Sequence, residues 1–102
     1  MFRVDEIVAK VSYEGGAALA AVHAASEDRV TLRFSSEPPE LGASMRLEIT
    51  HRVAVNDAMT DVSVRVLGTV GRTRQDGRAW VVDLDVRAAS PAAGLGRLSK
   101  HL

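Results

Sequence analysis

Three arginines, Arg72, Arg74 and Arg78, stand close together around an Asp-Gly pair and have the clearest capacity for binding chemistry. A guanidinium group binds a phosphate or a carboxylate through paired hydrogen bonds, so such a cluster can hold a phosphate or an acidic partner. Charged residues at a hairpin turn also have a simpler role, which is to stop an exposed strand edge from aggregating. We therefore take the arginines as a candidate partner-binding surface and keep a solvated turn as the alternative interpretation.

The three histidines, His23, His51 and His101, lie far apart in the sequence and show no paired ligand spacing. A metal site needs donors that converge on one point, so this spacing predicts no metal centre. The sequence also contains no glycine-rich phosphate loop and no nucleophile elbow. We therefore predict a protein that is not an enzyme and that needs no metal or cofactor.

Asp83 and Asp85 come closest to a carboxylate pair that could do acid–base chemistry, because residues two apart on a strand share a face. On an outward face near Arg65 and Arg87, however, they are better placed to pair with cations across the sheet. We therefore expect cross-strand partners for these carboxylates rather than catalysis.

The composition limits the classes of protein to consider. The chain has 102 residues, which suits one domain, and its 13 basic and 13 acidic residues give a formal net charge of +0. Without a net positive charge we expect no binding to nucleic acid. The absence of cysteine fits a reducing cytoplasm, and the charged start MFRVDEIVAK is unlike a signal peptide. No apolar run approaches the ~20 residues of a membrane helix, so we expect one cytoplasmic domain, residues 1–102, without membrane insertion.

Residues 61–87 predict a long antiparallel hairpin joined across Asp76-Gly77. Apolar side chains recur at every second position on both sides of the turn, which is typical of half-buried strands. The predicted inward residues are Val62, Val64 and Val66 before the turn and Trp80, Val82, Leu84 and Val86 after it. Gly68 and Gly71 interrupt the first strand, where a small barrel often needs a bulge or a sharp bend.

Two further alternating runs predict strands upstream of this hairpin, at residues 29–34 and 45–55. Residues 35–44 contain Pro38, Pro39 and Gly42 and predict a loop between these strands. We interpret NDAMTD, residues 56–61, as a polar connection into the long hairpin.

The two ends of the chain are less regular. Residues 3–13 fit both helical and strand spacing, and we leave the two open. The alanine-rich residues 17–25 favour a helix by propensity, but a double glycine precedes them, so we predict a strand. Ser90-Pro91 is typical of a helix start, and Leu95, Leu98 and Leu102 would then share one helical face.

This order of elements resembles the PilZ domain, a small bacterial β-barrel that commonly binds cyclic di-GMP. The resemblance covers residues 17–102 and rests on the strand and serine turn HAASEDRVTLRF, the loop from Pro39 to Gly42, the strand MRLEI, the long hairpin and the terminal helix. It implies an all-β fold, a six- or seven-stranded antiparallel barrel with a C-terminal helix. Another small barrel of SH3 or OB type is the alternative.

In the PilZ family two motifs hold the dinucleotide, an Arg-x-x-x-Arg pair before the barrel and (Asp/Asn)-x-Ser-x-x-Gly at the following turn. Here the turn aligns so that Ser26 matches, while Ala24 and Arg29 replace the acidic or amide residue and the glycine. The segment before the turn holds Arg3 and no second arginine. Ser26 and Arg29 are therefore the candidate ligand-binding residues that the resemblance leaves.

A PilZ-like scaffold without these motifs implies a non-enzymatic bacterial regulatory or adaptor module that acts through protein contacts, in motility or surface behaviour as the family suggests. We expect its contact surfaces at the arginine cluster and at any open strand edge, where a partner could add a strand. The alternative is a cyclic di-GMP receptor with a rearranged site around Ser26 and Arg29. The absence of one charged hydrogen bond from the usual site weakens binding by about 1.5–3 kcal/mol, which argues against this alternative.

Overall fold

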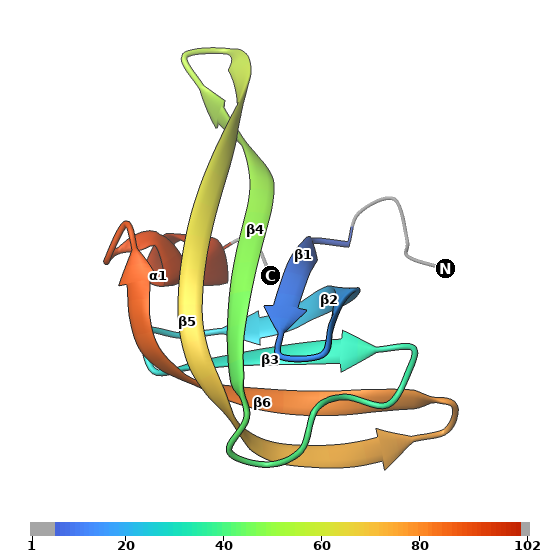
Figure 1. The fold of residues 1–102 in the computed structure, drawn as a ribbon. Helices are drawn as coiled ribbons and strands as arrows, with labels where there is room; N and C mark the ends of the chain where they lie inside the picture. Colours follow the sequence, from blue (N-terminus) through green and yellow to red (C-terminus); the bar gives the residue numbers. More distant parts are fainter. Residues whose placement is uncertain (1–5, 101–102) are drawn as a thin grey trace.

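The alternating apolar runs close into a barrel of six antiparallel strands, followed by one short helix (Figure 1). The computed structural model describes residues 6–100. Around the barrel the strands follow the order β1-β2-β3-β6-β5-β4, and β4 pairs back onto β1. The elements are β1 (Val8–Tyr13), β2 (Gly16–Ala25), β3 (Arg29–Phe34), β4 (Ser44–Val55), β5 (Ala58–Asp76), β6 (Ala79–Ser90) and α1 (Gly94–Ser99). The predicted all-β antiparallel barrel with a C-terminal helix is confirmed, with six strands in the described part of the chain.

Every second side chain of the central strands points into the barrel and forms its core. On β3 and on the part of β4 within the barrel, the inward residues are at most 2% exposed, whereas Val53, further along β4 on the same predicted face, is only partly buried. The buried residues are Val30, Leu32 and Phe34 on β3, and Met45, Leu47 and Ile49 on β4. Burying a side chain of this size contributes about 1.5–3 kcal/mol, so these two rows are a main source of the barrel's stability.

The first two strands form a hairpin, which decides between the alternatives that the sequence left open. β1 and β2 pair from Val8 with Ala21 to Tyr13 with Gly16. The alanine-rich β2 places Ala20 in the core, and it pairs with β3 on its other side. The backbone of β2 is hydrogen bonded to a neighbouring strand along each edge. This pairing outweighs the helix propensity of alanine.

The predicted long hairpin is present, with a turn that lies one residue further along than expected. Asp76 pairs with Ala79, so the turn consists of Gly77 and Arg78 rather than crossing at Asp76-Gly77. Gly77 adopts a φ of 63°, in the left-handed region that glycine enters without strain. Where the two strands line the core, the inward side chains of Val64, Val66, Val82 and Leu84 are at most 3% exposed.

Two breaks in the register of β5 against β6, beside Gly68 and Gly71, confirm the irregularities expected at these glycines. After the second break, Arg72 lies directly opposite Asp83, which is on the outward face of β6. Because one extra residue exchanges the two faces of a strand, the bulge turns Arg72 and Arg74 away from the core.

Strands β4 and β5 continue beyond the barrel as a two-stranded arm, residues 50–64 (Figure 1). β1 pairs with β4 only as far as Ile49, and β6 pairs with β5 only from Arg65 onward. Among the residues that the structure describes, the strands of the arm therefore pair only with each other. The arm leaves a strand edge open on each side.

The prediction of a polar connection over residues 56–61 is wrong. The connection consists only of Asn56 and Asp57, and β5 already begins at Ala58. Both turn residues have positive φ, 50° and 65°, as a tight type I′ hairpin turn requires. The polar residues that follow are exposed because they lie on an arm with no third strand, and not because they form a loop.

The prediction that Ser90 caps the C-terminal helix is also wrong. Ser90 is the last residue of β6 and pairs with Arg65 of β5. The helix begins only at Gly94, and the preceding Ala93 makes no side-chain capping hydrogen bond. Sheet pairing therefore extends to Ser90, and the chain turns before the helix starts.

Helix α1 is held against the barrel by its apolar side chains. Leu95 and Leu98 are both 0% exposed, as their predicted shared face requires. Leu102, the third residue predicted on that face, lies outside the described residues. Gly94 brings the start of the helix close to Val64 of β5, because a β-carbon there would lie 2.8 Å from a methyl group of Val64.

Replacing Gly94 with alanine is expected to destabilise the fold by about 1–3 kcal/mol, because the added methyl group overpacks the contact with the buried Val64. Gly96→Ala is the matched control, since its β-carbon would meet only Glu27 Oε1, at 3.8 Å. We expect this second variant to gain up to about 1 kcal/mol from helix propensity. Urea unfolding of both variants measures the difference, and equal midpoints would contradict this packing.

Candidate functional site

Ser26 and Arg29, the candidate ligand residues of the sequence, lie together at the turn between β2 and β3. The backbone N–H of Ser26 donates to the carbonyl oxygen of Arg29 at 2.8 Å. The backbone N–H of Arg29 in turn donates to the hydroxyl oxygen of Ser26 at 3.2 Å. The Ser26 side chain therefore closes the turn that carries it, as serine commonly does.

The guanidinium group of Arg29 faces a carboxylate on the neighbouring strand. Its Nε lies 3.9 Å from Oδ1 of Asp85 on β6, and both side chains are more than half exposed, at 60% and 56%. On the same face, the hydroxyl of Thr31 donates to Oδ1 of Asp83 at 2.8 Å. The two carboxylates do have cross-strand partners, as expected, but those partners come from β3 and not from Arg65 or Arg87.

Arg72 and Arg74 point outward from β5 and each meets a different neighbour on β6. Arg72 lies opposite Asp83, whereas Arg74 lies opposite Val81. Val81 also lies opposite Arg33 of β3, and it is only 6% exposed although it faces outward. The aliphatic stems of long arginine side chains can cover an apolar neighbour in this way.

Arg78 lines a hollow of about 270 Å³ together with Arg33, Asp76 and Glu6. Two cations and two carboxylates thus face the same space. Arg72 and Arg74 are not among the residues that line this hollow, so the structure joins one of the three grouped arginines to Arg33 there.

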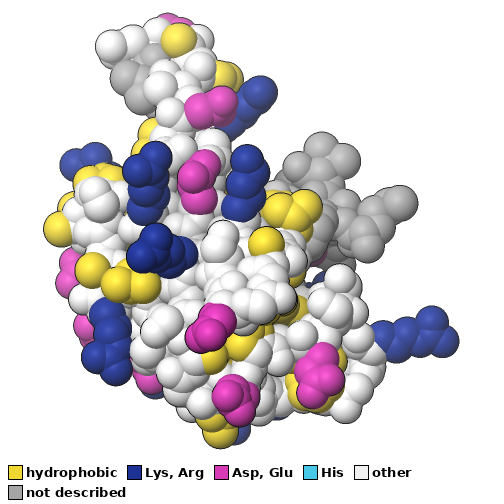
Figure 2. All heavy atoms as spheres, viewed as in Figure 1, with side chains coloured by type: hydrophobic (Ala, Val, Ile, Leu, Met, Phe, Trp, Pro, Cys, Tyr) yellow, Lys and Arg dark blue, Asp and Glu magenta, His cyan; other side chains and the backbone are white. Residues whose placement is uncertain are grey.

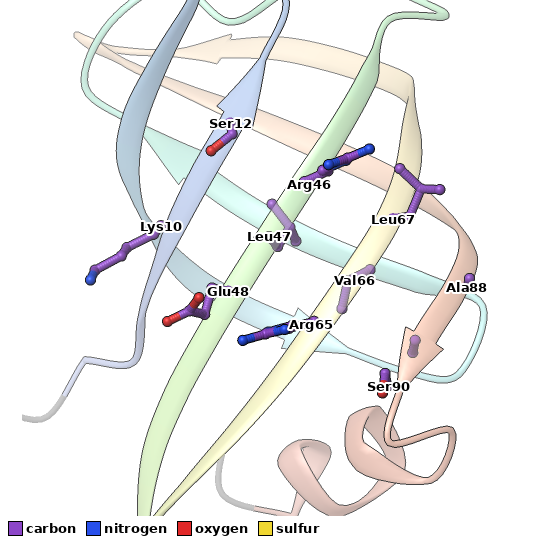
Figure 3. A pocket seen from close by; sticks show the side chains of 11 residues that line it. Lys10, Ser12, Arg46, Leu47, Glu48, Arg65, Val66, Leu67, Ala88 and Ser90 are labelled. Atoms are coloured by element: carbon purple, nitrogen blue, oxygen red, sulfur yellow. The ribbon is translucent and has the colours of Figure 1, made fainter.

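A larger groove, of about 530 Å³, crosses the outer face of the four strands β1, β4, β5 and β6 (Figure 3). Its lining side chains are those of Lys10, Ser12, Arg46, Leu47, Glu48, Arg65, Val66, Leu67, Ala88, Ala89 and Ser90. We call this feature the outer groove. Over β4 and β5, Lys and Arg side chains gather with Asp and Glu side chains between them (Figure 2).

The register of the strands arranges the outer groove in two rows of directly opposed residues. One row runs through Lys10, Glu48, Arg65 and Ser90. The other runs through Ser12, Arg46, Leu67 and Ala88. The first row alternates in charge, while the second brings one cation next to an apolar pair.

Sequence reasoning did not identify the outer groove as a site. The alternation of β4 and β5 did place Arg46, Glu48 and Arg65 on the outward face. An outward charged residue is ordinary, however, and four separate strands contribute to the groove. Only the order and pairing of the four strands around the barrel show which of these side chains are neighbours, and the alternation of apolar residues along each strand does not specify that order.

Within residues 6–100, the backbone groups along both edges of the arm pair with no third strand. In a hairpin with a two-residue turn, the residues that flank the turn, here Val55 and Ala58, are hydrogen bonded to each other through their backbones. Along an antiparallel pair of strands, such hydrogen-bonded pairs alternate with pairs whose N–H and C=O groups point away from the partner strand, towards the open edges. The pairing has no register shift along the arm. The residues with outward backbone groups are Thr50, Arg52 and Ala54 on β4 and Met59, Asp61 and Ser63 on β5.

The side chains of these six residues share one face of the arm. The hydroxyl oxygens of Thr50 and Ser63 are hydrogen bonded at 3.1 Å. Nε of Arg52 donates to Oδ1 of Asp61 at 3.2 Å. Met59 near the turn is 64% exposed, which is unusual for a large apolar side chain.

Comparison with known proteins gives no relative: no protein-family model, no curated protein and no solved structure matches this chain. Within residues 6–100, no three His, Asp or Glu side chains are grouped so that they could hold a metal ion. The same residues include no helix long and apolar enough to cross a membrane. The resemblance to PilZ domains stays a prediction.

Ser26→Ala is expected to destabilise the barrel by about 0.5–1.5 kcal/mol, because it removes the acceptor of the Arg29 amide in the turn. Arg29→Ala is expected to cost less than about 0.5 kcal/mol, because the ion pair with Asp85 is long and exposed. Chemical denaturation of both variants provides the comparison. A larger loss for Arg29→Ala would show that its guanidinium group has a structural role beyond this pair.

Proposed function

We propose that this protein is a non-enzymatic, PilZ-like regulatory or adaptor module that works in the bacterial cytoplasm by contacting other proteins. The observation that carries this proposal is the arm, residues 50–64, whose two strands have no other partner strand among the described residues. An extended segment of a partner protein can pair with such an edge and continue the sheet.

Two properties of the arm favour a partner. A two-stranded hairpin alone is only marginally stable in water, so a third strand adds stability to the outer part of the arm, beyond the buried Val64. Natural proteins usually protect exposed edges with charged side chains, proline or a bulge. The arm has no lysine, proline or bulge and carries only the charged pair Arg52 and Asp61 and the turn residue Asp57. Met59, in contrast, offers an exposed apolar contact at 64% exposure.

A receptor for cyclic di-GMP with a rearranged site is the second candidate function. The exposed guanidinium group of Arg29, with a side chain 60% accessible, is the feature that favours it. Against it, Asp85 already faces that group at 3.9 Å, and the hydroxyl oxygen of Ser26 accepts the Arg29 amide. We therefore rank protein contact first.

Met59→Lys is expected to weaken partner binding by about tenfold or more, because burying such a side chain contributes about 1.5–3 kcal/mol. Ala54→Pro should weaken it similarly, because proline removes an outward backbone donor from the β4 edge. The partner is captured from the native host with the tagged full-length chain, then purified and titrated against each variant.

Leu19→Lys is the matched control for this experiment, since Leu19 is 52% exposed but belongs to β2 of the barrel. It should bind the partner as the wild type does. Undiminished binding by both arm variants would reject the arm as the contact. Saturable heat on titration with cyclic di-GMP that disappears in Arg29→Ala, with no protein captured, would favour the second candidate.

A further inference from the structure

We infer that the outer groove is a second binding site, separate from the arm, and that its ligand is an extended protein segment in which carboxylates flank an apolar side chain. The groove crosses the outer face of four neighbouring strands, β1, β4, β5 and β6, between their outward side chains (Figure 3). Nothing in the proposed function of the arm requires this site, so the two can succeed or fail independently.

The charges of the outer groove favour an acidic ligand. Three cations, Lys10, Arg46 and Arg65, and one carboxylate, Glu48, line it, which leaves a net charge of +2 in a protein whose formal net charge is +0. Glu48 lies between Lys10 and Arg65 in the register, so these two cations already have an acidic neighbour. One cation of the groove therefore remains without a carboxylate directly across the strands.

That remaining cation is Arg46. Its direct neighbours across the strands are Ser12 on β1 and Leu67 on β5, so no carboxylate stands opposite it. A guanidinium group has five N–H donors, arranged so that two of them can donate parallel hydrogen bonds to one carboxylate. Arg46 is thus the residue of the groove at which a ligand carboxylate gains the most binding free energy.

An apolar surface lies directly beside Arg46. Leu67 is 40% exposed, and the exposed Ala88 of β6 lies opposite it. This contact depends on the register break beside Gly68, because the break brings Ala88 rather than Arg87 opposite Leu67. The ligand side chain next to the carboxylate is therefore apolar.

The length of the groove suits an extended segment. A neighbouring hollow of about 370 Å³ shares Ser12, Arg46 and Leu67 with it and is also lined by Tyr13, Glu14 and Ser44, so one carboxylate, that of Glu14, borders the hollow as well. The outer groove by itself has the volume of a typical small-ligand site, about 300–1,000 Å³. With its neighbour it forms a trough along which a chain can place alternate side chains on Arg46 and on Leu67.

The same residues argue against a nucleotide in this site. No aromatic side chain is among the residues that line the outer groove, so the groove itself gives a base no surface on which to stack; the aromatic Tyr13 lines the neighbouring hollow. Glu48 in the centre of the charged row would repel a chain of phosphates. A peptide carboxylate held at Arg46 lies one row away from Glu48, at the next outward position of β4.

Three fluorescent peptides of equal length test the inference by anisotropy with the full-length protein. In the first, glutamates flank a leucine; in the second, serine replaces the leucine; in the third, lysines replace the glutamates. We expect the first to bind best, with binding that weakens as salt rises because the attraction is screened. Each of the other two should bind about tenfold more weakly or worse.

Arg46→Glu should weaken binding of the first peptide about tenfold or more, because it replaces attraction by repulsion at the proposed carboxylate contact. Arg33→Glu is the matched control, since Arg33 is exposed on the outward face of β3, away from the outer groove. It should bind as the wild type does, and both variants must unfold at the wild-type urea midpoint.

Equal binding by Arg46→Glu and wild type, a preference for the lysine peptide, or no binding of any peptide at millimolar concentration would overturn the inference. Self-association in sedimentation velocity that Arg46→Glu abolishes would also overturn it, because the ligand would then be a second copy of this chain. Met59→Lys separates the two sites: it should leave peptide binding unchanged even where it abolishes the contact of the arm.

Discussion

The pairing of β4 with β5 is the constraint on which the rest of the structure depends. The two strands stay in one register from Ser44 opposite Thr69 to Val55 opposite Ala58. Within the barrel this ladder supplies two adjacent inward rows of the core, and β4 closes the ring by pairing with β1. Beyond the barrel the same ladder continues without a third strand and becomes the arm. A single uninterrupted register therefore produces both the most buried and the most open parts of the sheet.

The opposite edge of β5 works differently, because its pairing with β6 is broken twice. Each break adds one residue on one strand and so exchanges inward and outward positions. The break beside Gly68 brings Ala88 next to Leu67 in the outer groove. The break at Gly71 turns Arg72 and Arg74 outward, where Arg72 meets Asp83. The bulges leave the core rows intact and determine which side chains become neighbours on the outside.

Charge is balanced over the whole chain but not over its surface. Arg29 faces Asp85, and Arg52 faces Asp61, at distances of 3.9 and 3.2 Å. Such exposed pairs contribute little to stability, but they neutralise the faces that carry them. The outer groove keeps an excess of cations, because Arg46 has no acidic neighbour across either strand. A formal net charge of +0 thus conceals a local site with a preference for carboxylates.

The sequence alone determined most of the inward rows of β3, β4 and the long hairpin, because burial on a strand follows a period of two that can be counted directly. The all-β class followed from that count. The count is not exact, since the predicted inward residues Val62, Trp80 and Val86 are only partly buried, while the outward Val81 is buried. What the sequence could not determine was which strands are neighbours and in which register, because those depend on contacts between distant segments. Tertiary structure therefore decided that residues 58–61 are strand, that Ser90 ends a strand, and that Arg78 shares a hollow with Arg33. It also assembled the outer groove, since Arg46 meets Leu67 through the pairing of β4 with β5 and meets Ser12 only when β4 closes the ring against β1.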